Sequence, residues 1–195
     1  MKVAIIKYNA GNVQSVTFAL QRLGIEPVLT DNPEILSNAD KIIFPGVGEA
    51  STAMEYLKER KLDILIPQLK QPVLGICLGM QLMCSYSEEN NTPCLDIFNL
   101  KVKRFPENKS CKVPQMGWNN IYDLKGQLYT GIDNNSYVYF VHSYYAELSE
   151  YTIAKTDYIL PFSSSLNKDN FYATQFHPEK SSKTGNCILK NFLNL

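Results

Sequence analysis

The fold is decided by the stretch Pro72-Val73-Leu74-Gly75-Ile76-Cys77-Leu78-Gly79-Met80-Gln81. Its apolar first half predicts a buried strand, and residues 78–84 predict the start of a helix. A cysteine between two glycines at this junction matches the nucleophile-elbow pattern, in which the glycines permit a sharp turn without Cβ clashes. The turn would bring the Cys77 sulfur to the amino end of a helix, where free N–H groups favour the reactive thiolate. The alternative is that Cys77 is a small residue filling a tight turn.

Strands and helices alternate at short spacing up to this stretch. Buried strands are predicted over residues 2–8, 26–29 and 41–44, and helical segments over residues 13–23, 33–36, 49–59 and 62–69. Residues 9–12 are predicted to form a turn, and Asn12 or Ser15 could cap the following helix. This alternation predicts an α/β fold with an open, mostly parallel central sheet flanked by helices, in a flavodoxin-like arrangement. Ligands of such sheets collect beyond the carboxyl ends of the strands, where Cys77 and Pro45-Gly46-Val47-Gly48 both fall.

The second half of the chain is richer in strands. They are predicted over residues 97–105, 113–122, 137–145, 151–157 and 171–176, and a closing helix over residues 186–193. We expect these strands to extend the same sheet or to form a mixed sheet beside it. No linker or repeat divides the sequence, so residues 1–195 are expected to form a single domain.

Composition excludes several classes of function. The formal net charge is zero, so the chain lacks the basic field that nucleic-acid binding needs. No apolar run is long enough to span a bilayer, and the N-terminus has no signal-peptide layout. Five cysteines without a C-x-x-C pair argue against a disulfide framework or a zinc site. We therefore expect a cytoplasmic protein that needs no metal and no cofactor.

A second motif, Gln175-Phe176-His177-Pro178-Glu179, carries one of only two histidines. In an extended stretch His177 and Glu179 point the same way, and a carboxylate beside an imidazole fixes its tautomer and stabilises the imidazolium. Cys77, His177 and Glu179 could thus serve as nucleophile, base and orienting acid. Attack by a thiolate on a carbonyl group produces an oxyanion, which N–H donors stabilise. Leu78, at the helix start, can supply one such N–H group, and Val47 can supply another if its peptide points inward. The alternative is a lone histidine at a strand end beside an exposed glutamate.

The two motifs and the Pro45–Gly48 loop, in this order, resemble the class I, triad-type glutamine amidotransferases over nearly the whole chain. The resemblance implies that the Cys77 thiolate attacks the side-chain amide of L-glutamine and that ammonia is released. It also implies a set of glutamine-binding residues: Gly46, Gly48, Gln81, Ser143 and Tyr144. For Gln81 the alternative is an ordinary exposed helix residue, and for His142 a packed strand histidine is as plausible as a contact.

Within this family, Val113-Pro114-Gln115-Met116-Gly117-Trp118-Asn119 resembles the branch that supplies ammonia to a synthase (cyclase) subunit with a TIM-barrel fold, its obligate heterodimer partner in histidine biosynthesis. That partner makes imidazole glycerol phosphate and an aminoimidazole carboxamide ribotide (AICAR). The implied contacts with the partner are Asn12, Pro114, Met116, Gly117, Trp118 and Asn119, with Tyr137 and Tyr139 as further candidates. Trp118 could instead be a core residue. The chain departs from the family's usual residues at Lys7, at Gln115 and over residues 94–98.

Three other interpretations stay open at the level of sequence. A paralogous glutaminase could supply ammonia to a different synthase, such as a sugar amidotransferase. A non-catalytic binding module could use the same fold, and so could a free-standing cysteine hydrolase.

Overall fold

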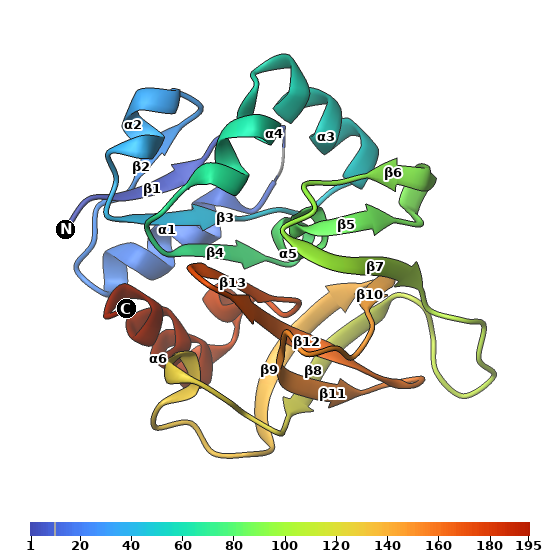
Figure 1. The fold of residues 1–195 in the computed structure, drawn as a ribbon. Helices are drawn as coiled ribbons and strands as arrows, with labels where there is room; N and C mark the ends of the chain where they lie inside the picture. The colour runs from blue at the N-terminus through green and yellow to red at the C-terminus, as the bar shows by residue number, and fades with distance from the viewer. Residues whose placement is uncertain (10) are drawn as a thin grey trace.

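The computed structural model describes residues 1–9 and 11–195, and its elements surround one large sheet (Figure 1). Five parallel strands form the first part, in the order β2-β1-β3-β4-β13. They are β1 (Val3–Ile6), β2 (Val28–Thr30), β3 (Lys41–Phe44), β4 (Val73–Ile76) and β13 (Phe171–Thr174). The parallel sheet expected from the sequence is therefore confirmed. The expected turn at residues 9–12 includes Ala10, which lies outside the described residues.

The sheet continues from β13 as a mixed sheet, in the order β12-β10-β7-β5-β6, with β11 paired to β12. A separate antiparallel pair, β8 and β9, lies beside it. The bounds are β5 (Cys84–Ser87), β6 (Thr92–Pro93), β7 (Phe98–Arg104), β8 (Gln115–Ile121), β9 (Ser136–His142), β10 (Tyr144–Ala146), β11 (Thr152–Asp157) and β12 (Pro161–Lys168). The strand-rich half thus extends the same sheet, as the first expectation has it, and the piece beside it is an antiparallel pair rather than a mixed sheet.

Helices cover both faces of the parallel strands (Figure 1). The α-helices are α1 (Val13–Arg22), α2 (Pro33–Ser37), α3 (Ala50–Glu59), α4 (Leu62–Leu65), α5 (Leu78–Met83) and α6 (Ser182–Leu193). Short 3-10 turns complete them: η1 (Ile66–Gln68), η2 (Glu89–Asn91), η3 (Gln127–Tyr129) and η4 (Pro178–Lys180).

The two-residue period of the strands sorts their side chains into two cores. Ala4 and Ile6 of β1 belong to the cluster that includes α3 and α4, whereas Val3 and Ile5 belong to the cluster that includes α1 and α6. The inner residues of β8 and β9, among them Phe140, join this second cluster. Because β1, β3 and β4 are buried on both faces, their sequences are apolar runs, apart from Lys41 at the start of β3 and Gly75 in β4, and such runs predict buried strands.

The junction between β4 and α5 is a strained elbow. Cys77 has φ 54° and ψ −105°, a conformation that residues other than glycine rarely adopt. The flanking glycines are required by close approach rather than by their own dihedral angles. A Cβ atom on Gly79 would overlap the carbonyl oxygen of Phe44, and one on Gly75 would lie 2.9 Å from the Met83 sulfur. The elbow therefore depends on β3 and α5 touching backbone to backbone.

Several boundaries differ from the sequence prediction. The strand expected at residues 26–29 lies at Val28–Thr30, and the strand expected at residues 137–145 breaks at Ser143, where the chain passes from one sheet to the other. Helix α6 begins at Ser182, four residues earlier than expected, and its first turn packs against η4 at Gly185. The expected strand over residues 171–176 ends at Thr174.

Strand β12 is missing from the prediction because it contains three successive serines. All three are buried, and two of the hydroxyls donate to neighbouring backbone, Ser165 to the Ala173 carbonyl at 2.6 Å and Ser163 to the Glu147 carbonyl at 2.7 Å. Polar residues are compatible with a central strand when their hydroxyl groups find such partners. Two of the three do so here, and the buried Ser164 hydroxyl has no partner among the described residues.

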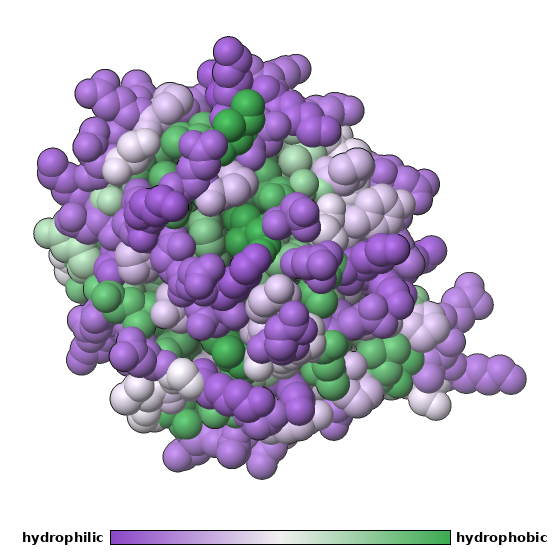
Figure 2. Space-filling model, in the orientation of Figure 1, coloured by the Kyte–Doolittle hydropathy of each residue, from purple (hydrophilic) through white to green (hydrophobic). Residues whose placement is uncertain are grey.

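Hydrophilic side chains cover most of the face seen in Figure 2, and hydrophobic ones gather only in small patches. Among the described residues, no helix has both the length and the apolar character needed to cross a membrane.

A Gly79→Ala substitution tests the constraint at the elbow. The added methyl group must displace the Phe44 backbone, so we expect the free energy of unfolding to fall by about 3 kcal/mol, the upper end of the usual cost of overpacking. The matched control is Gly131→Ala, where no atom lies within 4 Å of the new Cβ and only a φ of 74° is unfavourable. This control should cost about 1 to 2 kcal/mol. Equal losses for the two variants in urea denaturation would contradict the backbone contact.

Candidate active site

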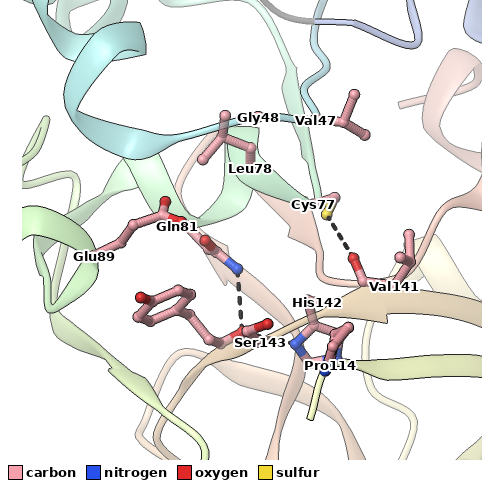
Figure 3. Close-up of a pocket in the computed structure, with 11 residues that line it drawn as sticks. Val47, Gly48, Cys77, Leu78, Gln81, Glu89, Pro114, Val141, His142 and Ser143 are labelled. Atoms are coloured by element: carbon pink, nitrogen blue, oxygen red, sulfur yellow. Dashed lines mark hydrogen bonds between the residues drawn. The ribbon is translucent and has the colours of Figure 1, made fainter.

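A pocket of about 310 Å³ opens beyond the carboxyl ends of the parallel strands (Figure 3). The residues that line it are Val47, Gly48, Cys77, Leu78, Gln81, Glu89, Pro114, Val141, His142, Ser143 and Tyr144. The loops that follow β1, β3, β4 and β13 all lie at this edge, because these strands are adjacent and parallel. The sheet thus brings together segments that are up to 167 residues apart in the sequence.

Cys77 lies at the floor of this pocket. Its backbone N–H donates to the Thr174 carbonyl at 2.7 Å, which ties the elbow to the end of β13. Its sulfur lies 3.8 Å from the Val141 carbonyl oxygen and 3.6 Å from Nε2 of Gln175 (Figure 3 draws the first of these contacts). Only 6% of the residue is exposed, and Cys77 is one of the residues that line the pocket.

His177 and Glu179 form a buried pair. Nδ1 of His177 donates to Oε1 of Glu179 at 2.7 Å, and both side chains are fully buried. The backbone of this segment is attached to β9, because the His177 N–H donates to the Tyr139 carbonyl at 2.9 Å and the Tyr139 N–H donates to the Ser181 hydroxyl at 2.9 Å. The second ring nitrogen, Nε2, is buried and has no hydrogen-bond partner among the described residues.

The charges around His177 favour its protonated form. Burial lowers the pKa of His177, but the negative charge of Cys77 and the hydrogen bond with Glu179 outweigh burial and raise this pKa to about 10. A shift of this direction means that the surroundings stabilise the imidazolium relative to the neutral ring. The ring can therefore hold a proton at neutral pH.

Asn12 contributes to this pair in a way that the sequence does not reveal. Its side-chain amide donates to Oε1 of Glu179 and lies 3.3 Å from Nδ1 of His177. Asn12 occupies the N-cap position of α1, but its side chain makes no capping bond to that helix, and Ser15 lies inside the helix, so neither residue caps it with its side chain. The amide is already engaged by a carboxylate far along the chain, and no local pattern could indicate that contact.

The Pro45–Gly48 loop packs against the first turn of α5. The Gly46 carbonyl accepts a hydrogen bond from the Leu78 N–H at 3.3 Å, so this N–H group is occupied. The two neighbouring carbonyls are also held: Pro45 accepts from the Tyr8 hydroxyl, and Val47 accepts from the Gly11 N–H at 3.3 Å. Burial and the charge of Cys77 raise the pKa of Tyr8 well above its ordinary value, so the hydroxyl remains a donor.

Gln81 and Glu89 occupy the other end of the pocket. Nε2 of Gln81 donates to the Tyr144 carbonyl at 3.1 Å and to Oε1 of Gln175 at 3.0 Å, and Figure 3 shows the first of these bonds beside Ser143. Glu89 accepts from the Ala50 N–H at 2.8 Å, and burial raises the pKa of this carboxyl group above its usual range. Glu89 is absent from the sequence prediction because it lies in a run of polar residues that is typical of a surface loop.

His142 is a packed residue that also lines the pocket. Its Nδ1 lies 2.7 Å from the Tyr144 carbonyl and its Nε2 lies 3.0 Å from the side-chain amide of Gln115. Burial lowers the pKa of His142 to about 4, so the ring is neutral and carries its one proton on Nδ1. Nε2 is then an acceptor, and Gln115 must turn its amide nitrogen toward it. His142 therefore takes no charge near the pocket at neutral pH.

The outer face of the β8–β9 pair is exposed and apolar. The register places Met116 opposite Val141 and Trp118 opposite Tyr139. Met116, Trp118 and Tyr137 are more than half exposed, and the Trp118 ring meets Tyr139 edge-on at a centroid distance of 6.0 Å. Pro114 is also exposed and lines the pocket, while Asn119 is half-buried and donates to the Asp157 carbonyl. The face thus runs from open surface to the pocket mouth at Val141.

Comparison with known proteins identifies the class. The family model for class-I glutamine amidotransferases matches residues 4–195, and the chain belongs to that family. The resemblance inferred from the motifs is thereby confirmed.

Within the family, the chain is similar along its whole length to proteins named imidazole glycerol phosphate synthase subunit HisH. It is 62% identical to the one from Bacteroides fragilis and 60% identical to the one from Bacteroides thetaiotaomicron, with complete coverage of both chains in each case. The protein of the same name from Haemophilus influenzae is 46% identical, over 99% of this chain and 97% of its own.

Solved structures support the fold. A putative GMP synthase protein from Thermoplasma acidophilum matches with a TM-score of 0.76 at 20% identity, covering 100% of this chain and 93% of that one. PurLQS from Thermotoga maritima matches with a TM-score of 0.74 at 16% identity, covering 99% and 97%.

The pKa values of His142 and His177 should differ widely, and neither should lie near the ordinary pKa of a histidine. In a ring-nitrogen NMR titration we expect His142 to stay neutral down to about pH 4 and His177 to stay charged up to about pH 10. Replacing the sulfur in Cys77→Ala removes the negative charge, so the pKa of His177 should fall by more than one unit while that of His142 changes little. An unchanged His177 titration in Cys77→Ala would contradict the charge pairing.

Proposed function

We propose that this chain is the glutaminase subunit of an imidazole glycerol phosphate synthase, acting in histidine biosynthesis. It hydrolyses glutamine to glutamate and ammonia through Cys77, His177 and Glu179, and passes the ammonia to a cyclase partner with a TIM-barrel fold. The observation that carries the proposal is the strained Cys77 elbow beside the buried His177–Glu179 pair, in a chain 62% identical to a HisH subunit over its full length. Residues 1–195 would act as one glutamine amidotransferase domain, in the reducing cytoplasm that suits five free cysteines.

The chemistry follows from the charges in the site. The Cys77 thiolate attacks the amide carbon of the substrate, and the carbonyl oxygen becomes an oxyanion. His177, held as an imidazolium by Glu179, donates its Nε2 proton to the leaving nitrogen, so ammonia departs and a glutamyl thioester remains. Neutral His177 then takes a proton from water, which attacks the thioester and releases glutamate and the thiolate.

The oxyanion needs N–H donors, and the observed conformation of the Pro45–Gly48 loop does not provide them. The Leu78 N–H points to the Gly46 carbonyl, which lies where the oxyanion would bind. Turning the peptide between Gly46 and Val47 would remove that carbonyl and bring the Val47 N–H toward the site. One such donor contributes about 3 kcal/mol to the stabilisation of the transition state. We therefore propose that this turn is the on/off switch of the glutaminase.

The pocket beyond Cys77 suits the charged end of glutamine. The Glu89 carboxylate faces this end of the pocket, and an ammonium group placed there would offset the cost of burying the carboxylate. Backbone groups of Gly48, Ser143 and Tyr144 lie around the same space and could hold the substrate carboxylate. The free oxygen of Gln81 would complete the site for the substrate ammonium.

The exposed face of β8 and β9 is the proposed contact with the cyclase. Exposed aromatic and methionine side chains beside glycine are typical of interface centres rather than of open surface. The face ends at Val141, whose carbonyl contacts the Cys77 sulfur. A partner that covers it would therefore close the pocket mouth and collect ammonia where it forms.

A glutamate-release assay tests the function. We expect the free chain to hydrolyse glutamine slowly and the complex with its cyclase to be at least about 100-fold faster, because the oxyanion donors become available. Cys77→Ala should abolish glutamine-dependent synthesis by the complex and leave synthesis from added ammonium intact. Full glutamine-dependent synthesis by Cys77→Ala would refute the triad, and equal rates with and without the partner would refute the switch.

Trp118→Ala should weaken binding of the cyclase by about 30-fold or more, since a buried aromatic anchor contributes about 2 kcal/mol or more. Titration calorimetry with the cyclase measures the change. Ile64→Ala is the matched control, because Ile64 is similarly exposed but lies on α4, away from the β8–β9 pair. If both substitutions leave the affinity unchanged, the contact lies elsewhere.

A further inference from the structure

We infer that Gln175 is a positioning residue that aims the attacking sulfur and, through Gln81, the group that receives the substrate's ammonium end. The inference rests on the proposed glutaminase function. Gln175 is completely buried between the end of β13 and His177, and its backbone N–H is fixed by the Ser164 carbonyl at 2.9 Å. Its side-chain amide lies between Cys77 and Gln81. The Gln175 Nε2 atom is 3.6 Å from Sγ of Cys77, and the Gln175 Oε1 atom is 3.0 Å from Nε2 of Gln81.

The direction of this chain of hydrogen bonds is set by one backbone carbonyl. The oxygen and nitrogen of an amide side chain have nearly the same shape, so their places follow from their partners. The Tyr144 carbonyl can only accept, so the nitrogen of Gln81 must face it. The second hydrogen of that nitrogen then points to Gln175, which must present its oxygen. The nitrogen of Gln175 is consequently left to donate to the Cys77 sulfur.

Two consequences follow for the reaction. Both N–H groups of Gln81 are used, so its oxygen is the atom left for the pocket, and within the described residues it has no hydrogen-bond donor. An acceptor at this point favours a positively charged substrate group. At the other end, the N–H of Gln175 holds the sulfur in one orientation and stabilises its negative charge, as hydrogen bonds to charged groups do. One buried amide thus serves both substrate recognition and the nucleophile.

The test is a comparison of Gln175→Met and Gln81→Met in the complex with the cyclase. Methionine keeps the approximate volume and removes the hydrogen bonds. Gln175→Met should lower kcat about 10- to 100-fold, by loss of a bond to a charged group, and raise KM for glutamine about 10-fold. Gln81→Met should raise KM with little change in kcat. In the double variant, KM should be no higher than in Gln81→Met, because Gln175 acts on binding through Gln81.

A second substrate separates positioning from a structural role. Glutaramate is glutamine without its α-amino group, so Gln175→Met should leave its KM unchanged while still lowering its kcat. Alkylation of Cys77 by iodoacetamide, followed by mass spectrometry, should slow in Gln175→Met and not in Gln81→Met. If Gln175→Met does not fold, Gln175→Asn, which withdraws the amide by one methylene, should give the same pattern. Thermal unfolding identifies the variant to be used.

The possible outcomes distinguish a failure of the role inferred for Gln175 from a failure of the proposed glutaminase function. Additive KM effects in the double variant, or equal KM penalties for glutamine and glutaramate, would overturn the role of Gln175 while wild-type glutamine hydrolysis leaves the proposed function standing. Absence of glutamine hydrolysis by the wild-type complex would overturn the proposed function, and the alkylation rates would still decide whether Gln175 acts on the sulfur.

Discussion

The contact between the backbone of α5 and the backbone of β3 is the constraint on which the site depends. Gly79 lies against the Phe44 carbonyl so closely that no side chain fits between them. This contact holds α5 tightly over the sheet, and the chain enters the helix from β4 through the positive-φ conformation of Cys77. A residue in such a conformation costs about 1 to 3 kcal/mol, which the surrounding structure must offset. The bond from the Cys77 N–H to Thr174 is part of that support.

The same geometry explains why the imidazole of His177 lies at the same edge of the sheet as the Cys77 sulfur. The elbow follows β4, and His177 follows the adjacent parallel strand β13, so neighbouring strand ends deliver nucleophile and imidazole to one edge. His142 and His177 are both buried, yet their pKa values move in opposite directions. The polar partners of His142 among the described residues are a carbonyl and an amide, whereas His177 bonds to a carboxylate and lies in the field of Cys77. Burial alone therefore does not decide the charge of a histidine here; its partners do.

Local sequence patterns predict the structure correctly where it depends on residues that are close together in the sequence. The buried parallel strands are mostly apolar runs, and the elbow is a five-residue motif, so both were recognisable. The patterns failed where structure depends on distant partners. Ser163 and Ser165 are strand residues only because neighbouring carbonyls accept their hydroxyls, and the long aromatic stretch ends at Ser143 only because two sheets meet there. The engagement of Asn12 by Glu179 likewise joins residues from opposite ends of the chain.

The Pro45–Gly48 loop is held in place on both sides of one peptide group that can change its orientation. The carbonyls on both sides of the Gly46–Val47 peptide are held, one by Tyr8 and one by Gly11, so only the middle peptide can turn. Among the described residues, one hydrogen bond to Leu78 keeps its present orientation, and such a bond contributes only about 1 kcal/mol. The proposed activation would exchange this bond for an N–H group aimed at the substrate. A partner needs to supply only a small free energy to move such a peptide, and the gain in rate is much larger because the donor acts on the transition state.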